Sequence, residues 1–259
     1  MLELIDTHCH LTDRRLVRQA PAVLERAAQA GVCEVVCASG EIADAFAAAD
    51  LAARHDHVYF TAGVHPHDAK HAATDFLDAL ESLLARLRCV AIGEIGLDYH
   101  YDFSPRPVQQ EVFARQLDLA RRLGRRVVIH SREALDDTLA ILARSGLPGE
   151  RVIFHSFTEG PAGVGRVLDF GAAVSFSGIV TFPRAIDVRQ SATAVPDDRL
   201  LIETDAPYLS PEPVRKMKVN EPANVVHVAA CLAELRRTSL GPLAELTTAN
   251  ARRLLLTEL

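Results

Sequence analysis

The chain opens with the stretch Leu2-Glu3-Leu4-Ile5-Asp6-Thr7-His8-Cys9-His10, in which a short apolar run leads into two histidines. Seven more runs of this kind, short, apolar and rich in β-branched residues, follow at intervals of roughly 20–35 residues. Together with Leu2–Thr7 they are Cys33–Ala38, Val58–Ala62, Cys89–Gly93, Arg126–His130, Val152–His155, Ala172–Ser175 and Leu200–Thr204. Continuous apolar runs of this length predict the buried strands of a parallel sheet.

Segments with a helical period lie between these runs. In Val108–Leu123 the apolar residues form a wide stripe that recurs about every 3.6 positions. Gly124 and Gly146 stand where two such helices should end. Eight strand–helix units predict an α/β fold, a closed (β/α)8 TIM barrel that forms a single domain over residues 1–259. Two amphipathic helices, around Asn224–Leu235 and Pro242–Leu256, are expected to close and cap it.

An open, doubly wound sheet is the alternative architecture. It would favour a glycine-rich phosphate loop after the first strand, and the sequence has none there. The net charge of −6 argues against a basic protein that coats nucleic acid, but not against an enzyme. The five cysteines form no CxxC pair, so we expect reduced thiols rather than a thiolate zinc site. Without a secretion signal or a stretch of about 18 apolar residues, a cytoplasmic protein with no membrane span is expected.

Residues suited to metal or proton chemistry follow nearly every predicted strand at its C-terminal end. In chain order they are His8 and His10, His65 and His67, Glu94, His130, His155, and Glu203 with Asp205. In a barrel these strand ends all open onto one mouth, so residues that are distant in sequence should converge in space. Imidazole and carboxylate ligands suit Zn²⁺ or Mn²⁺ better than Mg²⁺, which prefers oxygen.

The His8-x-His10 pair is the strongest local signal. Positions i and i+2 of a strand share a face, so two imidazoles can bind one cation at about 2.0–2.1 Å. Buried histidines that donate to backbone carbonyls are the alternative, and that explanation fits one or two of these residues but not the whole set. We therefore predict a divalent-metal-dependent hydrolase with six metal ligands: His8, His10, Glu94, His130, His155 and Asp205.

Six segments at these positions resemble the TatD family of metal-dependent deoxyribonucleases, a branch of the amidohydrolase-like barrels. They are Ile5–Leu11 (IDTHCHL), Gly63–His67 (GVHPH), Ile92–Tyr99 (IGEIGLDY), Val128–Arg132 (VIHSR), Val174–Gly178 (VSFSG) and Glu203–Tyr208 (ETDAPY). The resemblance extends over almost the whole chain. It implies a hydrolase that cleaves phosphodiester bonds in DNA through an activated water.

The resemblance also implies two divalent metal ions (Zn, Mn or Mg). It assigns His8, His10, Glu94 and Asp205 to one ion, and Glu94, His130 and His155 to the other. Glu94 would bridge the ions in place of the carboxylated lysine that related barrels often use. His65 matches a family position near the substrate phosphate, and Glu203 matches the acidic residue just before the metal-binding aspartate.

Two segments depart from the family pattern. In His155-Ser156-Phe157-Thr158-Glu159-Gly160 a serine replaces the usual cysteine and one residue is added before the glycine, so the loop after the ligand is expected to differ. The stretch Arg215–Pro222 (RKMKVNEP) keeps Asn-Glu-Pro and three cations but rearranges its basic part. The resemblance therefore does not by itself imply phosphate contacts for the Arg215–Pro222 loop.

Hydrolysis of a phosphodiester needs an activated water and a counter-charge for the transition state, and bound divalent metals supply both. Asp205 is the predicted general base, and Glu203 is predicted to support catalysis by orienting ligands or water. Substrate binding is assigned to His65, Arg132 and Tyr99. Further candidates for phosphate or base contacts are Arg184, Arg215, Lys216, Lys218, Tyr101, Phe103 and Phe157.

The predicted substrate is DNA, as single strands or strand ends, because a shallow acidic protein with few such phosphate and base contacts should bind long duplexes poorly. The same hydrolytic chemistry would serve an esterase or deacylase that acts on aminoacyl-tRNA or on another small ester or amide. A non-catalytic metal-binding protein is disfavoured because no ligand is missing. The sequence leaves the oligomeric state open.

Overall fold

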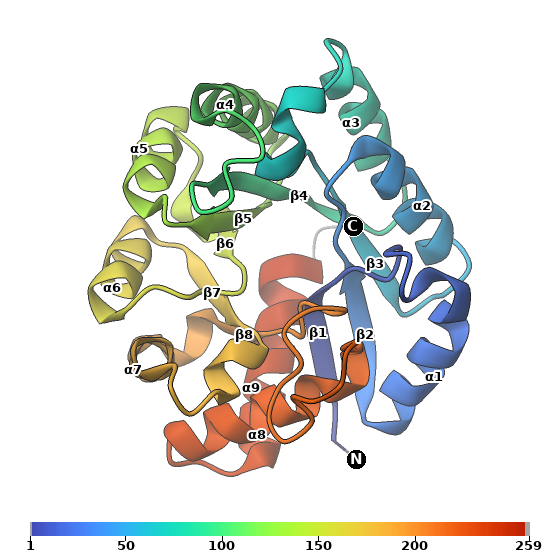
Figure 1. Cartoon of the computed structure of the whole chain (residues 1–259), viewed down its shortest axis with the longest axis vertical. Helices are drawn as coiled ribbons and strands as arrows, with labels where there is room; N and C mark the ends of the chain where they lie inside the picture. Colours follow the sequence, from blue (N-terminus) through green and yellow to red (C-terminus); the bar gives the residue numbers. More distant parts are fainter. Residues whose placement is uncertain (1, 257–259) are drawn as a thin grey trace.

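Eight parallel strands pair in their order along the chain in the computed structural model, which describes residues 2–256. They are β1 (Leu4–Cys9), β2 (Val32–Cys37), β3 (Val58–Ala62), β4 (Cys89–Asp98), β5 (Val127–Arg132), β6 (Val152–Phe154), β7 (Ala173–Phe176) and β8 (Leu200–Ile202). The strands surround the centre of the molecule and the helices form the outer ring (Figure 1). This arrangement confirms the predicted (β/α)8 TIM barrel.

The outer ring is built from helices that alternate with the strands. They are α1 (Ala20–Gln29), α2 (Ile42–Ala52), α3 (Phe76–Leu84), α4 (Arg106–Leu123), α5 (Leu135–Ser145), α6 (Pro161–Phe170), α7 (Ile186–Ala194), α8 (Val225–Leu235) and α9 (Leu240–Ala251). Gly124 and Gly146 end α4 and α5 as predicted, with left-handed φ angles of 63° and 69° that favour glycine. Within residues 2–256 no helix combines the length and the apolarity that crossing a membrane requires.

The barrel closes between β1 and the residues that follow β8. The backbone N–H of Asp205 donates to the carbonyl of His8 at 2.9 Å. The backbone N–H of His10 donates to the carbonyl of Ala206 at 2.6 Å. Next to this seam, the buried carboxylate of Asp6 accepts hydrogen bonds from the backbone N–H of Thr204 at 2.9 Å and from its hydroxyl at 2.5 Å. The segments that carry the first and last predicted ligands thus also close the sheet.

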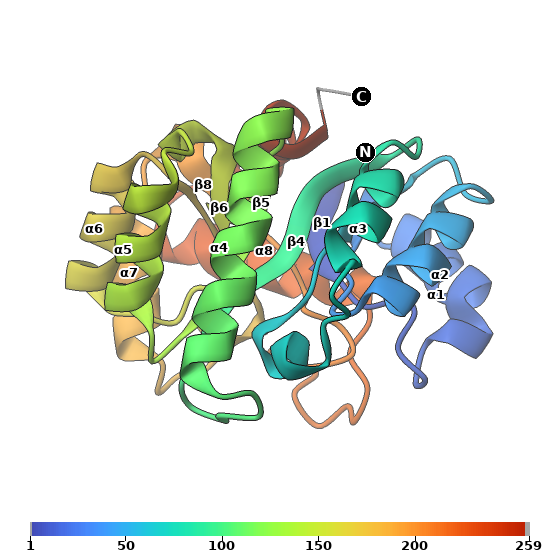
Figure 2. The same cartoon turned by 90° about the horizontal axis from the view of Figure 1, so that it is seen from above.

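An apolar layer inside the barrel fills the end opposite the mouth. Inward-facing strand residues such as Ile5, Val128 and Leu201 pack there against a π-helical turn, Arg252–Leu256, whose three leucines are buried. Figure 2 shows this dark red turn on the upper side, while the loops after β4 and β8 lie on the lower side. The predicted helix Pro242–Leu256 is therefore α9 followed by a turn that forms the floor of the barrel.

Strand β4 extends to Asp98, beyond the predicted end at Gly93, because it continues to pair with β5 as far as Arg132. Gly96 permits this pairing. Its φ is 140°, and a Cβ at this position would lie 2.0 Å from the carbonyl oxygen of His130. Strands β6 and β8 are shorter than predicted, so the candidate ligands after them lie on loops at the mouth.

Candidate metal centre

The carboxylate of Glu94 lies at the centre of a histidine cluster in the mouth of the barrel. Its Oε2 lies 3.2 Å from Nε2 of His8 and 3.7 Å from Nε2 of His10. Its Oε1 lies 2.7 Å from Nε2 of His155 and 2.9 Å from Nδ1 of His130. One carboxylate oxygen therefore faces the histidines at the end of β1, and the other faces those of β5 and the loop after β6.

Asp205 and His65 complete the inner ring of the cluster. Oδ1 of Asp205 lies 3.4 Å from Nε2 of His10, and Asp205 has a left-handed φ of 56°, which aspartate tolerates better than most residues. Nε2 of His65 lies 3.3 Å from Oε1 of Glu94. Among residues 2–256, donor atoms within 4.8 Å of one another form four groups: His8, His10 and Glu94; Glu94, His130 and His155; His8, His155 and Asp205; and His65, His67 and His130. All six predicted ligands thus come together in one cluster.

The His8 imidazole shows that these donors fit a cation. Its side chain is buried, and within residues 2–256 neither of its ring nitrogens makes a hydrogen bond. An unsatisfied buried polar group costs roughly 1–3 kcal/mol. The ring is also fixed in place, because it stacks on His155 at a centroid distance of 4.0 Å. A divalent cation held with Glu94 would satisfy a ring nitrogen that makes no hydrogen bond within residues 2–256.

Burial and neighbouring charges set the protonation states of the cluster. Burial lowers the pKa of His8, and it lowers the pKa of His65 to about 4. Burial alone would raise the pKa of Glu94, but the nearby histidines, His155 first, lower it well below its ordinary value. Burial likewise opposes protonation of His155, whereas Glu94 and Glu203 raise its pKa well above the ordinary value. A cation that binds His155 must therefore displace a proton, as metals generally do.

A second carboxylate, that of Asp98, lies behind His130. Its Oδ2 is 3.0 Å from Nε2 of His130 and 2.8 Å from Nε2 of His67. Its Oδ1 accepts the backbone N–H groups of His100 and Tyr101. Burial would raise the pKa of Asp98, but hydrogen bonds from His130 and His67 lower it well below its usual range. An ionised carboxylate that orients an imidazole in this way is typical of metal sites.

The sequence predicts His67 at the mouth of the barrel but gives Asp98 no role there. The apolar run that predicts the fourth strand ends at Gly93, five residues before Asp98. Strand periodicity is the signal that could identify Asp98, since Glu94, Gly96 and Asp98 share one face of a strand only if that strand continues beyond Gly93.

Glu203 contacts the cluster from behind rather than from the open mouth. Its side chain is buried, and its Oε1 lies 3.2 Å from Nδ1 of His155. Its Oε2 has no hydrogen-bond partner among the described residues. Glu203 thus contacts the ring of His155 on the side away from Glu94, and its supporting role in catalysis stays a prediction.

Arg132 and Tyr99, the other two residues predicted to bind substrate, have different surroundings. Arg132 is the last residue of β5, at the mouth, and its guanidinium lies 4.7 Å from the ring centroid of Tyr101. The hydroxyl of Tyr99 instead donates to Asp137 at 2.7 Å and accepts from Gln110 at 2.6 Å. These contacts direct Tyr99 towards α4 and α5, so its assignment to substrate binding stays a prediction.

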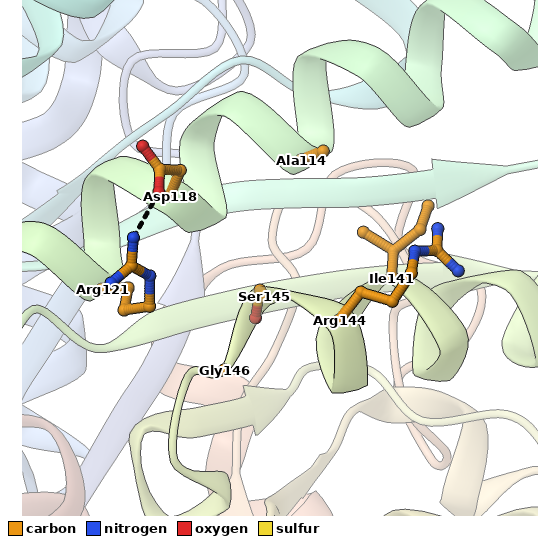
Figure 3. Close-up of a pocket in the computed structure, with 7 residues that line it drawn as sticks. All are labelled: Ala114, Asp118, Arg121, Ile141, Arg144, Ser145 and Gly146. Atoms are coloured by element: carbon orange, nitrogen blue, oxygen red, sulfur yellow. Dashed lines mark hydrogen bonds and ion pairs between the residues drawn. The ribbon is translucent and has the colours of Figure 1, made fainter.

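A hollow of about 650 Å³ lies outside the mouth, between α4 and α5 (Figure 3). It is lined by Ala114, Asp118, Arg121, Ile141, Arg144, Ser145 and Gly146. Arg121 already donates to Asp118 at 2.8 Å. The lining includes none of the clustered histidines, so the hollow is separate from the candidate metal centre.

Comparison with known proteins identifies the family. Residues 5–256 match the model of the family described as TatD related DNase. A Bacillus subtilis (strain 168) protein named "Uncharacterized metal-dependent hydrolase YabD" is 38% identical over 252 residues, which cover 97% of this chain and 98% of that protein. A Klebsiella pneumoniae (strain 342) protein named "3'-5' ssDNA/RNA exonuclease TatD" is 34% identical, with 97% of both chains covered.

A solved structure agrees with the sequence matches. The crystal structure of YJJV, a TatD homolog from Escherichia coli K12, superposes with a TM-score of 0.92 at 31% identity and covers 97% of each chain. The matches span the barrel and all of the clustered residues. The chain is therefore a metal-dependent hydrolase that belongs to the TatD-related DNase family.

Proposed function

We propose that this protein is a nuclease that uses two divalent metal ions to hydrolyse phosphodiester bonds in single-stranded DNA or at DNA ends. One observation carries the proposal: the two oxygens of Glu94 face two different sets of histidines. His8 and His10, with Asp205, form one ligand set, and His130 and His155 form the other. Relatives from Klebsiella pneumoniae and Edwardsiella piscicida, both named 3'-5' ssDNA/RNA exonuclease TatD, support the choice of substrate.

The donor set favours Zn²⁺ or Mn²⁺ over Mg²⁺, because four of the six proposed ligands offer imidazole nitrogen. When bound, the two ions lower the pKa of a water molecule towards neutrality and offset the charge that develops on the phosphoryl group. The side chains of the protein position the general base, the metal ligands and the substrate.

Asp205 is the proposed general base. Its side chain keeps 15% of its surface exposed, against 4% for Glu94, so water at the mouth can reach its carboxylate. His10 lies 3.4 Å from Oδ1, and the backbone hydrogen bond to His8 holds the residue at the seam. The carboxylate accepts the proton of the attacking water.

The remaining residues position ligands or substrate. Glu203 orients His155 and Asp98 orients His130 from behind, which fixes which ring nitrogen faces Glu94. His65 Nε2 points into the cluster, where it can donate to a phosphate oxygen, and Arg132 supplies a cation at the rim. We propose that residues 1–259 form a single catalytic domain. We also propose a cytoplasmic location, since the five cysteines are free thiols.

The decisive experiment compares purified wild-type protein with Glu94→Gln and Asp205→Asn in Zn²⁺, Mn²⁺ and Mg²⁺. End-labelled single-stranded DNA, duplex DNA and aminoacyl-tRNA serve as substrates, and His227→Ala, on the outer helix α8, is the matched control. We expect Asp205→Asn to slow DNA hydrolysis by about 10²–10⁴-fold while the protein retains metal. We expect Glu94→Gln to lose both activity and bound metal. Hydrolysis of aminoacyl-tRNA alone would overturn the nuclease assignment and leave the hydrolase.

A further inference from the structure

Every aromatic side chain that is largely exposed in the described part of the chain lies on a loop at the mouth of the barrel. Tyr101 and Phe103, on the loop after β4, are 47% and 54% exposed, and Tyr208, after β8, is 47% exposed. None of the three contributes to the apolar clusters that hold the barrel together. Their position therefore needs a reason other than folding, and exposed apolar groups gathered at a site mark binding.

Each of these rings contacts an imidazole of the metal centre or of its supporting shell. The rings of Tyr101 and Phe103 stack on each other at 5.1 Å with an interplanar angle of 11°, and His67 lies edge-on to both, at 5.5 Å and 4.8 Å. The ring of Tyr208 lies 6.0 Å from that of His10. Tyr208 is thus a direct neighbour of one candidate ligand, His10, whereas His67 lies between the other two rings and His130.

A guanidinium accompanies each aromatic group. Arg132 lies 4.7 Å from the ring centroid of Tyr101, and Arg15 lies 4.3 Å from that of Tyr208. Arg15 is also paired with Asp13 at 2.8 Å, whereas Arg132 makes no ion pair with any residue between 2 and 256. An aromatic face beside a cation matches the chemistry of one nucleotide, a flat base joined to an anionic phosphate.

The two groups lie on opposite sides of the metal centre. We call Tyr101, Phe103 and Arg132 the β4 platform, and Tyr208 with Arg15 the β8 platform. The strands follow one another from β1 to β8 around the closed barrel, so β4 and β8 are half a turn apart. Glu94 and its histidines occupy the space between them.

We propose that the two platforms bind two unpaired nucleobases, one on each side of the phosphodiester bond that the metal centre cleaves. This inference rests on the proposed nuclease function and makes it more specific. A ring can stack only on a base whose face is free, which a base inside a duplex does not offer. The platforms therefore select single strands and frayed ends, through stacking rather than through hydrogen bonds to base edges.

The test uses short single strands that carry the fluorescent base 2-aminopurine at each position in turn. Binding is measured in EDTA, so that no hydrolysis occurs, and stacking on a ring quenches the fluorescence. We expect quenching at two neighbouring positions in the wild-type protein. Phe103→Ala should abolish it at one position and Tyr208→Ala at the other, each with an affinity loss of about 5- to 150-fold.

Three controls separate stacking from loss of structure. Leu87→Ala removes an apolar side chain that is 76% exposed before β4, away from the mouth, and should bind like the wild type. Tyr208→Phe keeps the ring and should keep the quenching. Strands with abasic sites at the two positions should bind wild-type protein and both alanine variants equally.

Failure of this inference and failure of the nuclease function are distinguishable. DNA hydrolysis by a wild-type protein that shows no quenching would overturn the platforms and leave the nuclease. Alanine variants that lose as much affinity for abasic strands as for normal ones would also overturn the platforms. Quenching at two positions without hydrolysis in any metal would support the platforms and overturn the nuclease.

Discussion

Nε2 of His130 lies 3.0 Å from Oδ2 of Asp98, on the side of the ring that points away from Glu94. This contact leaves Nδ1 as the nitrogen that faces the metal centre. Asp98→Asn keeps the size of the side chain but removes its charge, so we expect metal affinity to fall by about 10–100-fold. Competition with a chelating dye measures the change. Asp102→Asn, an exposed neighbour that pairs with Arg106, should bind metal like the wild type.

Divalent metal should stabilise the folded protein, because the unfolded chain has no preformed cluster. At a free concentration of about 100 times Kd, binding adds about 2.7 kcal/mol, which corresponds to a rise in Tm of roughly 5–10 °C for a barrel of this size. Thermal unfolding with Zn²⁺ and then with excess EDTA measures the shift. His8→Ala should abolish it, while His227→Ala should retain it. An equal shift in His8→Ala would remove His8 from the ligand set.

The floor of the barrel should be sensitive to truncation of one side chain. Leu255 is 1% exposed and packs inside the barrel against residues of several strands. Leu255→Ala removes buried methyl groups from a closed space, so we expect a loss of about 2–5 kcal/mol in the free energy of unfolding. Urea denaturation measures it. The exposed control, Leu87→Ala, should stay within about 0.5 kcal/mol of the wild type.

Gly96→Ala should damage the site through the backbone. The added Cβ would meet the carbonyl oxygen of His130 at 2.0 Å, so β5 would have to move and carry His130 away from Glu94. We expect both metal affinity and stability to fall. Gly124→Ala is a matched control, because its φ is also positive but no atom lies within 4 Å of the new Cβ. Equal metal affinity in the two variants would contradict the claim that close packing at Gly96 holds His130 beside Glu94.

Alkaline pH should weaken the fold through two buried thiols. Burial raises the pKa of Cys37 and of Cys89 from 9.0 to about 12. Below pH 9 the contribution of these thiols to the free energy of unfolding is complete. As pH rises towards 12 that contribution declines, because the thiols ionise first in the unfolded chain. Each thiol lowers stability by about 1.4 kcal/mol per pH unit in that range. Urea denaturation between pH 9.5 and 11 should show a shallower decline in Cys89→Ala, and an unchanged slope would contradict the assignment.

Strand positions were predictable because parallel strands covered on both faces must be continuous apolar runs. Val58–Ala62 matches β3 at both ends. The extension of β4 was not predictable from local sequence, since it depends on close packing at Gly96 against a strand some thirty residues later. The shortening of β8 has a similar origin, because the chain leaves the strand to form the seam with His8 and His10.

The candidate ligands could be identified from residue type and strand ends, but their mutual orientation could not. That His130 presents Nδ1 to Glu94 follows from the contact of its other nitrogen with Asp98, which no pattern in the sequence records. Tyr99 and Tyr101 are two positions apart in the segment after β4. Only the fold shows that the first turns towards α4 and α5 and the second towards the mouth.

The seam between β1 and β8 has a consequence for the newly made chain. His8 and His10 are translated about 195 residues before Glu203 and Asp205. Until the later pair is added, the sheet has two open edges and the cluster lacks Asp205. The segment after β8 closes the hydrogen-bonded ring and also brings Asp205 to His10, so one segment completes both the seam and the candidate metal centre. A chain whose barrel is still open therefore also lacks a complete candidate metal centre.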